Sequence, residues 1–200
     1  MYFKIYLGHS IATTGEAKDS IRVANNIRDI LNDKELGNMG EVYVASENMA
    51  INDKTNDPTP ADIYQGDITR LMGADIVIYD LNGNRQDGTI SEIGFTAGYG
   101  EGLRKAGKEL NQLVVGYTSN SRVISPDFAY GVPSASACHL PLGMIEEWGA
   151  FVGTEERMYK ALEILKEVVK ANKELSQEDV FKIANKRIND EITSPDGNYK

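Results

Sequence analysis

Cysteine and histidine are scarce in this chain. Cys138 is its single cysteine, and His9 and His139 are its two histidines, far apart and without the spacing of metal ligands. One cysteine excludes an internal disulfide, and so few thiol and imidazole groups argue against a zinc site. No G-x-S-x-G motif is present, so a Ser-His-Asp hydrolase has little support. We therefore expect no zinc site.

Positive charge is also in short supply. The 200 residues carry 21 Lys and Arg against 30 Asp and Glu, a formal net charge of -9. Such a chain repels phosphate polymers and anionic membranes. The opening stretch "MYFKIYLGHSIATTG" lacks the features of a signal peptide, and no apolar run approaches membrane-spanning length. We expect a cytoplasmic protein that binds neither nucleic acid polymers nor membranes and acts on small molecules or proteins.

Strand-like and helix-like segments alternate along the chain. Nearly continuous apolar runs predict buried strands at 2–8, 41–46, 75–81 and 112–118. Amphipathic patterns predict helices at 16–33, 60–73, 89–105, 154–173 and 176–192. This alternation predicts an α/β fold with a parallel sheet between helices.

We expect one domain over residues 1–173, followed by a C-terminal helix and a loose tail over 174–200. That helix either packs on a neighbouring subunit or completes the domain. Residues 119–141, rich in Ser, Pro and Gly, predict a long excursion, and 47–60 predict a mobile loop.

Polar residues gather where the predicted strands end, which in a parallel sheet is one edge. Tyr6, Gly8, Asp80 and Asn82 lie at such ends, and Glu92 opens the helix that follows. Thr89 to Glu92 fits a T-x-x-E capping box, so a purely structural role for Glu92 is one alternative.

Three other features favour chemistry, the first being that Tyr6, Asp67 and Asp80 converge on the same edge. Asp87 and Gly88 predict a tight turn at the switch from strand to helix. Gly94 and Gly98 predict a close approach to the helix backbone. We expect Glu92 to stay ionised, since a helix N-terminus favours an anion.

Three stretches together resemble the nucleoside 2-deoxyribosyltransferase family: "IYLG" at 5–8, "IYQGDITRLMGADIVIYDLNG" at 63–83 and "DGTISEIG" at 87–94. The similarity covers residues 3 to 118. It implies a flavodoxin-like fold and makes Glu92 the nucleophile that holds deoxyribose as a covalent ester. It also implies that Tyr6 orients this nucleophile. Asp67 then contacts the base and acts as its proton donor when the base departs.

The resemblance implies further that 2′-deoxynucleosides and free purine or pyrimidine bases are the substrates. The chain is then a homo-oligomer with sites near subunit interfaces and no cofactor. The candidate substrate-binding residues are Gly8, Asn48, Asp87, Gly88 and Met144. Two departures affect this set. Gln86 stands where the family has its sugar-contacting aspartate, one residue before Asp87, and "PLGM" at 141–144 lacks the family's Asn.

Two other functions remain open. One is a 2′-deoxynucleoside 5′-monophosphate N-glycosidase that uses water as acceptor; Ser10, Thr13 and Thr14 in the first turn could then bind the phosphate. The other is a non-catalytic nucleotide-binding module. In that case Tyr6 is a half-buried ring with a solvated hydroxyl, and Asp67 is a solvated helical acid.

Overall fold

The computed structural model of the chain describes residues 1–81, 87–118 and 139–193, with only the backbone of Lys54 and His139. Most of the predicted excursion, Asn82, Gln86 and the predicted loose tail lie outside these residues.

Five parallel strands form the central sheet. They are β1 (Phe3–Gly8), β4 (Gly40–Val44), β5 (Ile76–Asp80), β6 (Leu113–Tyr117) and β7 (Ala150–Gly153), in the order β4-β1-β5-β6-β7. With β4 as the second strand of the sheet in chain order, this is the 2-1-3-4-5 order of flavodoxin-like folds. Four strands confirm the sequence prediction, and the short β7 was missed.

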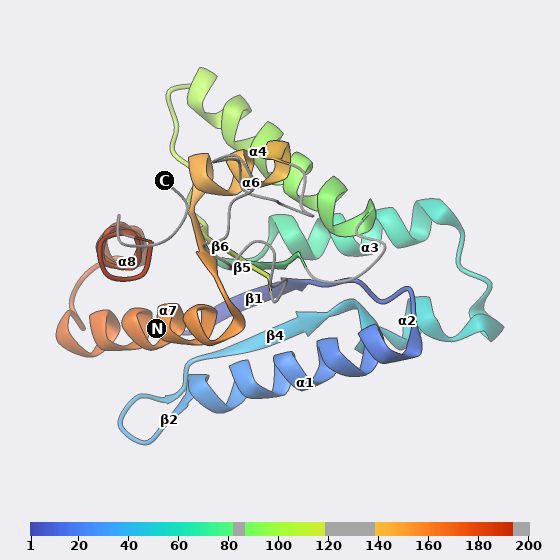
Figure 1. The fold of residues 1–200 in the computed structure, drawn as a ribbon, viewed down its shortest axis with the longest axis horizontal. Coiled ribbons are helices and arrows are strands. Elements are labelled where there is room, and N and C mark those ends of the chain that lie inside the picture. The colour runs from blue at the N-terminus through green and yellow to red at the C-terminus, as the bar shows by residue number, and fades with distance from the viewer. Residues whose placement is uncertain (82–86, 119–138, 194–200) are drawn as a thin grey trace, which may run out of the picture.

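Helices cover both faces of the sheet (Figure 1). On one face lie α1 (Thr14–Leu31) and α7 (Glu155–Ala171), with α8 (Gln177–Glu191) beside α7. On the other lie α3 (Pro60–Met72), α4 (Asp87–Lys105) and α6 (His139–Trp148). The predicted three-layer α/β fold is therefore confirmed. Short elements complete the described chain: β2 (Asn32–Asp33), β3 (Gly37–Asn38), η1 (Ala45–Glu47), α2 (Met49–Asn52) and η2 (Lys54–Asn56).

Helix α8 shares the core of the preceding domain. Val180, Phe181, Ala184 and Ile188 are buried in the same cluster as the residues of β1 and α7, and the Phe181 ring centroid lies 5.6 Å from that of Phe3. Full burial of a large apolar side chain stabilises a fold by about 1.5 to 3 kcal/mol. The helix thus finds its packing partner within its own chain.

Hydroxyl side chains cap the N-termini of several helices. The Thr154 and Ser176 hydroxyls accept bonds from the backbone N–H groups of Arg157 and Asp179. The capping box predicted at Thr89 is wrong, because α4 begins two residues earlier, at Asp87. Thr89 is a buried residue inside the helix.

The start of α4 corrects two further predictions. Asp87 and Gly88 are the first two helical residues rather than a tight turn. Among the described residues, a Cβ added at Gly94 or Gly98 would meet nothing within 4 Å, so no other part of the described chain makes the predicted close approach there. It is made at Gly100, where an added Cβ would lie 2.7 Å from the Trp148 ring of α6.

Within the three described ranges, no helix is both long and apolar enough to cross a membrane.

Candidate active site

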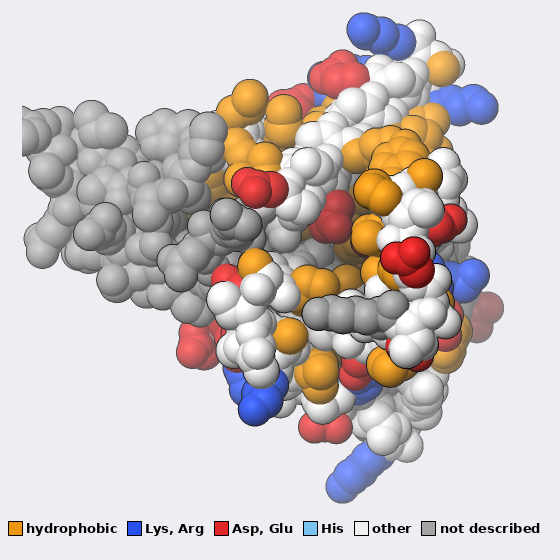
Figure 2. Space-filling view, turned by 90° about the vertical axis from the view of Figure 1, so that its right-hand side faces the viewer, with side chains coloured by type: hydrophobic (Ala, Val, Ile, Leu, Met, Phe, Trp, Pro, Cys, Tyr) orange, Lys and Arg blue, Asp and Glu red, His pale blue; other side chains and the backbone are white. Residues whose placement is uncertain are grey.

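A cavity of about 290 Å³ opens at the carboxyl edge of the sheet. Figure 2 views this end of the molecule and shows acidic and hydrophobic side chains around a central hollow. The lining residues come from four parts of the chain: the turn after β1, the start of η1, and one side each of α3 and α4. They are His9, Ser10, Ile11, Ala12, Ala45, Asp67, Asp87, Gly88, Thr89 and Glu92.

Glu92 is held by a tyrosine from the neighbouring strand. The Tyr6 hydroxyl donates a 2.8 Å hydrogen bond to Glu92 Oε1. Burial first, and then the charge of Glu92, raise the pKa of Tyr6 far above its ordinary value, so this hydroxyl keeps its proton and remains a donor. The second carboxylate oxygen, Oε2, is buried and makes no hydrogen bond to the residues that the structure describes. One oxygen of Glu92 is therefore fixed, and the other is left for a ligand.

A second tyrosine fixes the helix turn that carries Glu92. The Tyr79 hydroxyl lies 3.1 Å from the Glu92 backbone oxygen, to which it donates, and 2.6 Å from the Thr96 hydroxyl. Tyr79 is fully buried in the sheet. These bonds tie α4 to the end of β5 and so set the position of the carboxylate relative to Tyr6.

Gly8 makes room for this arrangement. A Cβ added there would lie 2.6 Å from Glu92 Oε2 and 2.9 Å from Tyr79 Cδ1. Real Cβ atoms do not approach heavy atoms so closely, so a larger residue would displace the carboxylate or the ring. Gly8, predicted to contact substrate, therefore lies directly against the Glu92 side chain.

Burial raises the pKa of Glu92 to about 7. The hydrogen bond from Tyr6 opposes this shift, and the nearby charge of Asp67 adds to it. The prediction that the helix N-terminus keeps Glu92 ionised is wrong. Glu92 is the sixth residue of α4, beyond the first turn to which the favourable effect of the helix dipole is confined.

Asp67 is also hydrogen-bonded to a tyrosine, as Glu92 is. The Tyr43 hydroxyl donates a 2.7 Å bond to Asp67 Oδ1 and accepts a 3.1 Å bond from Asn48 Nδ2. The rings of Tyr6 and Tyr43 lie 5.4 Å apart, centroid to centroid, and are tilted by 32°. The two tyrosine–carboxylate pairs thus pack side by side at the cavity.

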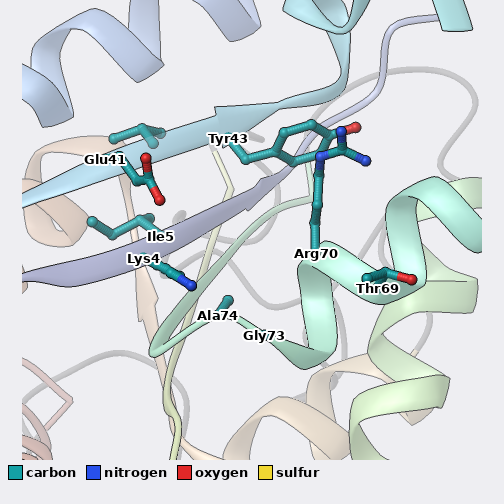
Figure 3. A pocket seen from close by; sticks show the side chains of 9 residues that line it. Lys4, Ile5, Glu41, Tyr43, Thr69, Arg70, Gly73 and Ala74 are labelled. Carbon is teal, nitrogen blue, oxygen red and sulfur yellow. The ribbon is translucent and has the colours of Figure 1, made fainter. Parts of the chain in front are cut away.

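A larger cavity of about 390 Å³ lies beside Tyr43, between the β1–β4 side of the sheet and α3. In Figure 3 the Arg70 guanidinium covers the Tyr43 ring, 4.7 Å from its centroid. The one carboxylate in its lining, Glu41, is exposed. We therefore place the candidate chemistry at Glu92, where a buried carboxylate faces the smaller cavity.

The structure brings together most of the predicted site residues, but not all. Asp87 and Gly88 are exposed and line the mouth of the Glu92 cavity. Asn48 reaches the site only through Tyr43. Met144 lies elsewhere, in a groove of about 460 Å³ between α4 and α6.

Three site residues were missed by the sequence analysis: Tyr43, Tyr79 and His9. Tyr43 and Tyr79 stand near the carboxyl ends of β4 and β5, and His9 directly follows β1. Position at a strand end, the signal that singled out Tyr6, could have found all three.

Fold and site together define a flavodoxin-like α/β protein with a small-ligand cavity at the carboxyl edge of its sheet. The family model described as nucleoside 2-deoxyribosyltransferase matches residues 5–159, and the chain belongs to this family. Its members are enzymes that act on nucleosides and bases, and they include related N-glycosidases.

Among solved structures, the chain is similar to a conserved protein from Enterococcus faecalis V583, with 22% identity and a TM-score of 0.62. The match covers 82% of this chain and 98% of the other, and it supports the fold. A search of curated proteins found no match.

Proposed function

We propose that this protein transfers 2-deoxyribose between the bases of 2′-deoxynucleosides, through a covalent ester on Glu92. The observation that carries the proposal is the Tyr6–Glu92 hydrogen bond, which holds one carboxylate oxygen and leaves Oε2 without a partner among the described residues. A nucleophilic carboxylate needs one such oxygen, placed in a cavity that admits the sugar.

In the first step, an oxygen of ionised Glu92 attacks the anomeric carbon as the bond from that carbon to the base nitrogen breaks. The electron pair of that bond leaves with the base, and Asp67 donates the proton that the departing base takes up. In the second step, a nitrogen of another base attacks the same carbon while the ester bond breaks, which returns the carboxylate. Asp67 accepts the proton that this nitrogen loses. Two inversions give net retention, as in retaining glycosidases. The missing 2-hydroxyl makes the oxocarbenium-like transition state easier to reach.

The raised pKa of Glu92 sets the pH dependence of this reaction. With a pKa of about 7, roughly half of the free protein carries the nucleophilic anion at neutral pH. We therefore expect kcat/KM to rise with pH through the neutral range and to level off above it.

The remaining roles are also proposals. Asp87 and Gly88 at the mouth of the cavity meet the sugar, and Gly8 keeps the floor open beside Glu92. Asn48 orders Tyr43, and so acts on the base side of the site. Met144 lies outside the cavity of its own chain, so it can reach a substrate only from a neighbouring copy in a homo-oligomer. Localisation in the cytoplasm stays a prediction.

The start of α1 bears on whether the substrate is a nucleoside or a 5′-nucleotide. Thr13 and Glu16 form a capping box in which Thr13 N–H donates to Glu16 Oε2 at 2.8 Å and Glu16 N–H donates to the Thr13 hydroxyl at 3.2 Å. The predicted phosphate donor Thr13 is thus engaged by a carboxylate, whose charge repels a phosphate at that helix end. This favours the unphosphorylated substrate.

The test is to incubate the purified protein with 2′-deoxyinosine and adenine, with thymidine and adenine, and with 5′-dIMP, and to separate the products. We expect deoxyadenosine from the nucleosides, and loss of this product in Glu92→Gln. Glu101→Gln, on the same helix, is the matched control and should keep the activity. Free base and sugar without deoxyadenosine would favour the N-glycosidase. No turnover of any donor would favour the non-catalytic module.

A further inference from the structure

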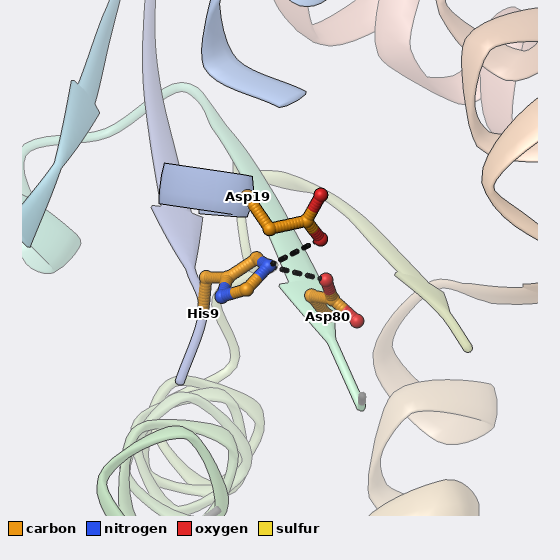
Figure 4. A group of neighbouring side chains, drawn as sticks. All are labelled: His9, Asp19 and Asp80. Atoms are coloured by element: carbon orange, nitrogen blue, oxygen red, sulfur yellow. Dashed lines mark ion pairs between the residues drawn. The ribbon is translucent and has the colours of Figure 1, made fainter. Parts of the chain in front are cut away.

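His9, Asp19 and Asp80 meet beside the Glu92 cavity (Figure 4). His9 follows β1, Asp19 lies on α1, and Asp80 ends β5. The His9 Nε2 atom is 2.8 Å from Asp80 Oδ2 and 3.5 Å from Asp19 Oδ2. The side chains of His9 and Asp80 are 2% and 1% exposed, whereas that of Asp19 is 43% exposed. The cluster is thus buried on two sides and open to solvent on the third.

A hydrogen bond to the backbone determines which ring nitrogen of His9 carries the proton in the neutral ring and which one acts as an acceptor. Nδ1 lies 2.6 Å from the Ser10 carbonyl oxygen, and a carbonyl oxygen can only accept, so Nδ1 carries a proton. In the neutral ring, Nε2 then presents its lone pair toward two negative groups. Nε2 is buried and makes no hydrogen bond of normal geometry among the described residues, although Asp80 Oδ2 is close. Either a second proton on Nε2 or a bound cation would satisfy this nitrogen, because its nearest neighbours are carboxylate oxygens.

The surrounding contacts orient all three side chains toward one point. The Ser10 carbonyl fixes the His9 tautomer, and the Tyr117 hydroxyl donates a 2.8 Å bond to Asp80 Oδ2. Arg22 Nε donates a 2.7 Å bond to Asp19 Oδ1, so that Oδ2 of the same carboxylate faces His9. Ligands of metal ions in proteins are held by outer hydrogen bonds of this kind.

We propose that His9 Nε2, Asp19 Oδ2 and the Asp80 carboxylate form a binding site for a divalent transition-metal ion of the Mn²⁺ or Zn²⁺ type. The three ligand atoms all lie within 4.8 Å of one another, a spacing that one ion can bridge. A nitrogen and two carboxylates suit such ions better than Ca²⁺ or Mg²⁺, which prefer oxygen alone. The two carboxylates attract a cation, although Arg22 already offsets part of the charge of Asp19.

The composition of the chain gives no sign of this site. Cysteine and histidine are scarce, and the one imidazole and two carboxylates come from three separate segments of the sequence. The ion would tie the turn after β1 to α1 and β5, at the border of the cavity that His9 also lines. The proposed transfer reaction takes no step through it.

The test is a titration of chelator-treated protein with MnCl₂, with free Mn²⁺ followed by electron paramagnetic resonance, and with ZnCl₂ by calorimetry. We expect one ion per chain, with affinity weakened about 10-fold or more in Asp19→Asn. The Asp19 side chain is 43% exposed, so this variant should fold. Asp29→Asn, at an exposed acid of the same helix, is the matched control and should bind as wild type does.

Nuclear magnetic resonance spectra of the two histidines distinguish a bound metal ion from the alternative, a second proton on the His9 ring. Bound Mn²⁺ should broaden the His9 ring signals in wild type and not in Asp19→Asn, and Zn²⁺ should shift Nε2. Absence of binding, equal affinity in Asp19→Asn and wild type, or a His9 ring that stays doubly protonated with both metals present would each overturn the proposal.

Discussion

Replacing Glu92 by glutamine should stabilise the protein at alkaline pH. Glutamine keeps the shape of the side chain and removes the charge. Burial raises the pKa of Glu92 from 4.5 to about 7. At 1.36 kcal/mol per pKa unit, the ionised form costs the folded state roughly 3 kcal/mol relative to the unfolded chain. The side chain keeps some exposure, which lets solvent screen the charge, so this figure is an upper bound.

The sign follows from proton binding. Because the pKa of this carboxyl is higher in the folded protein than in the unfolded chain, the folded protein binds more protons between pH 4.5 and 7. The protonated carboxyl contributes its full share of the stability below pH 4.5, and this contribution is lost as the pH rises through 7. Of this loss, roughly 2 kcal/mol falls between pH 5 and pH 8. Glu92→Gln has no such loss.

Urea unfolding of wild type and Glu92→Gln at pH 5 and pH 8 measures the effect. Only the difference between the two proteins matters, because all other titrating groups are shared. We expect the variant to gain roughly 2 kcal/mol over wild type on going from pH 5 to pH 8. Glu101→Gln, at an acid of the same helix whose side chain is 46% exposed, should show no such gain. Parallel pH curves for wild type and Glu92→Gln would refute the argument that burial raises this pKa.

Three further substitutions test the site. Tyr6→Phe removes the hydrogen bond that lowers the pKa of Glu92, so the rise of kcat/KM should move up by about one pH unit; an unmoved profile would count against the pairing. Gly8→Ala places a Cβ 2.6 Å from Glu92 Oε2 and should lower kcat about 100-fold, and near-normal turnover would contradict the close contact. Tyr43→Phe frees Asp67 and should lower kcat/KM about 10-fold without moving the Glu92 limb of the pH profile, whereas unchanged kinetics would remove Tyr43 from the site.

Gly102→Ala is the matched control for Gly8→Ala. Gly102 is an exposed residue of α4, and among the described residues a Cβ added there would meet nothing within 4 Å. Alanine should therefore be tolerated there, with little change in turnover.

The layers of the fold could be predicted because they depend on short-range patterns. β5 is buried at every residue and β1 at every residue except Lys4, and such nearly continuous apolar runs encode buried strands directly. The amphipathic stripe of α7 is equally local. β7 is only four residues long, too short for its pattern to stand out.

The site was harder to predict because its contacts join distant parts of the chain. Glu92 lies 86 residues from Tyr6 in sequence, and its T-x-x-E pattern is equally typical of a helix cap. The family resemblance singled out Tyr6, Asp67 and Glu92, which the fold brings to one edge. Tyr43 and His9 carry no local motif, since their partners Asp67 and Asp80 lie on other elements.

One physical cause connects the stability of this protein with its proposed chemistry. Burial of Glu92 against Gly8 and the Tyr79 ring removes water from the carboxylate, and this raises its pKa and destabilises the ionised fold. The same loss of water leaves Oε2 more basic than an exposed carboxylate oxygen, which favours attack on an electrophilic carbon. Tyr6 limits the shift with one hydrogen bond, so that the anion remains populated near neutral pH. A site tuned in this way should become more stable whenever the charge is removed, and inactive by the same change.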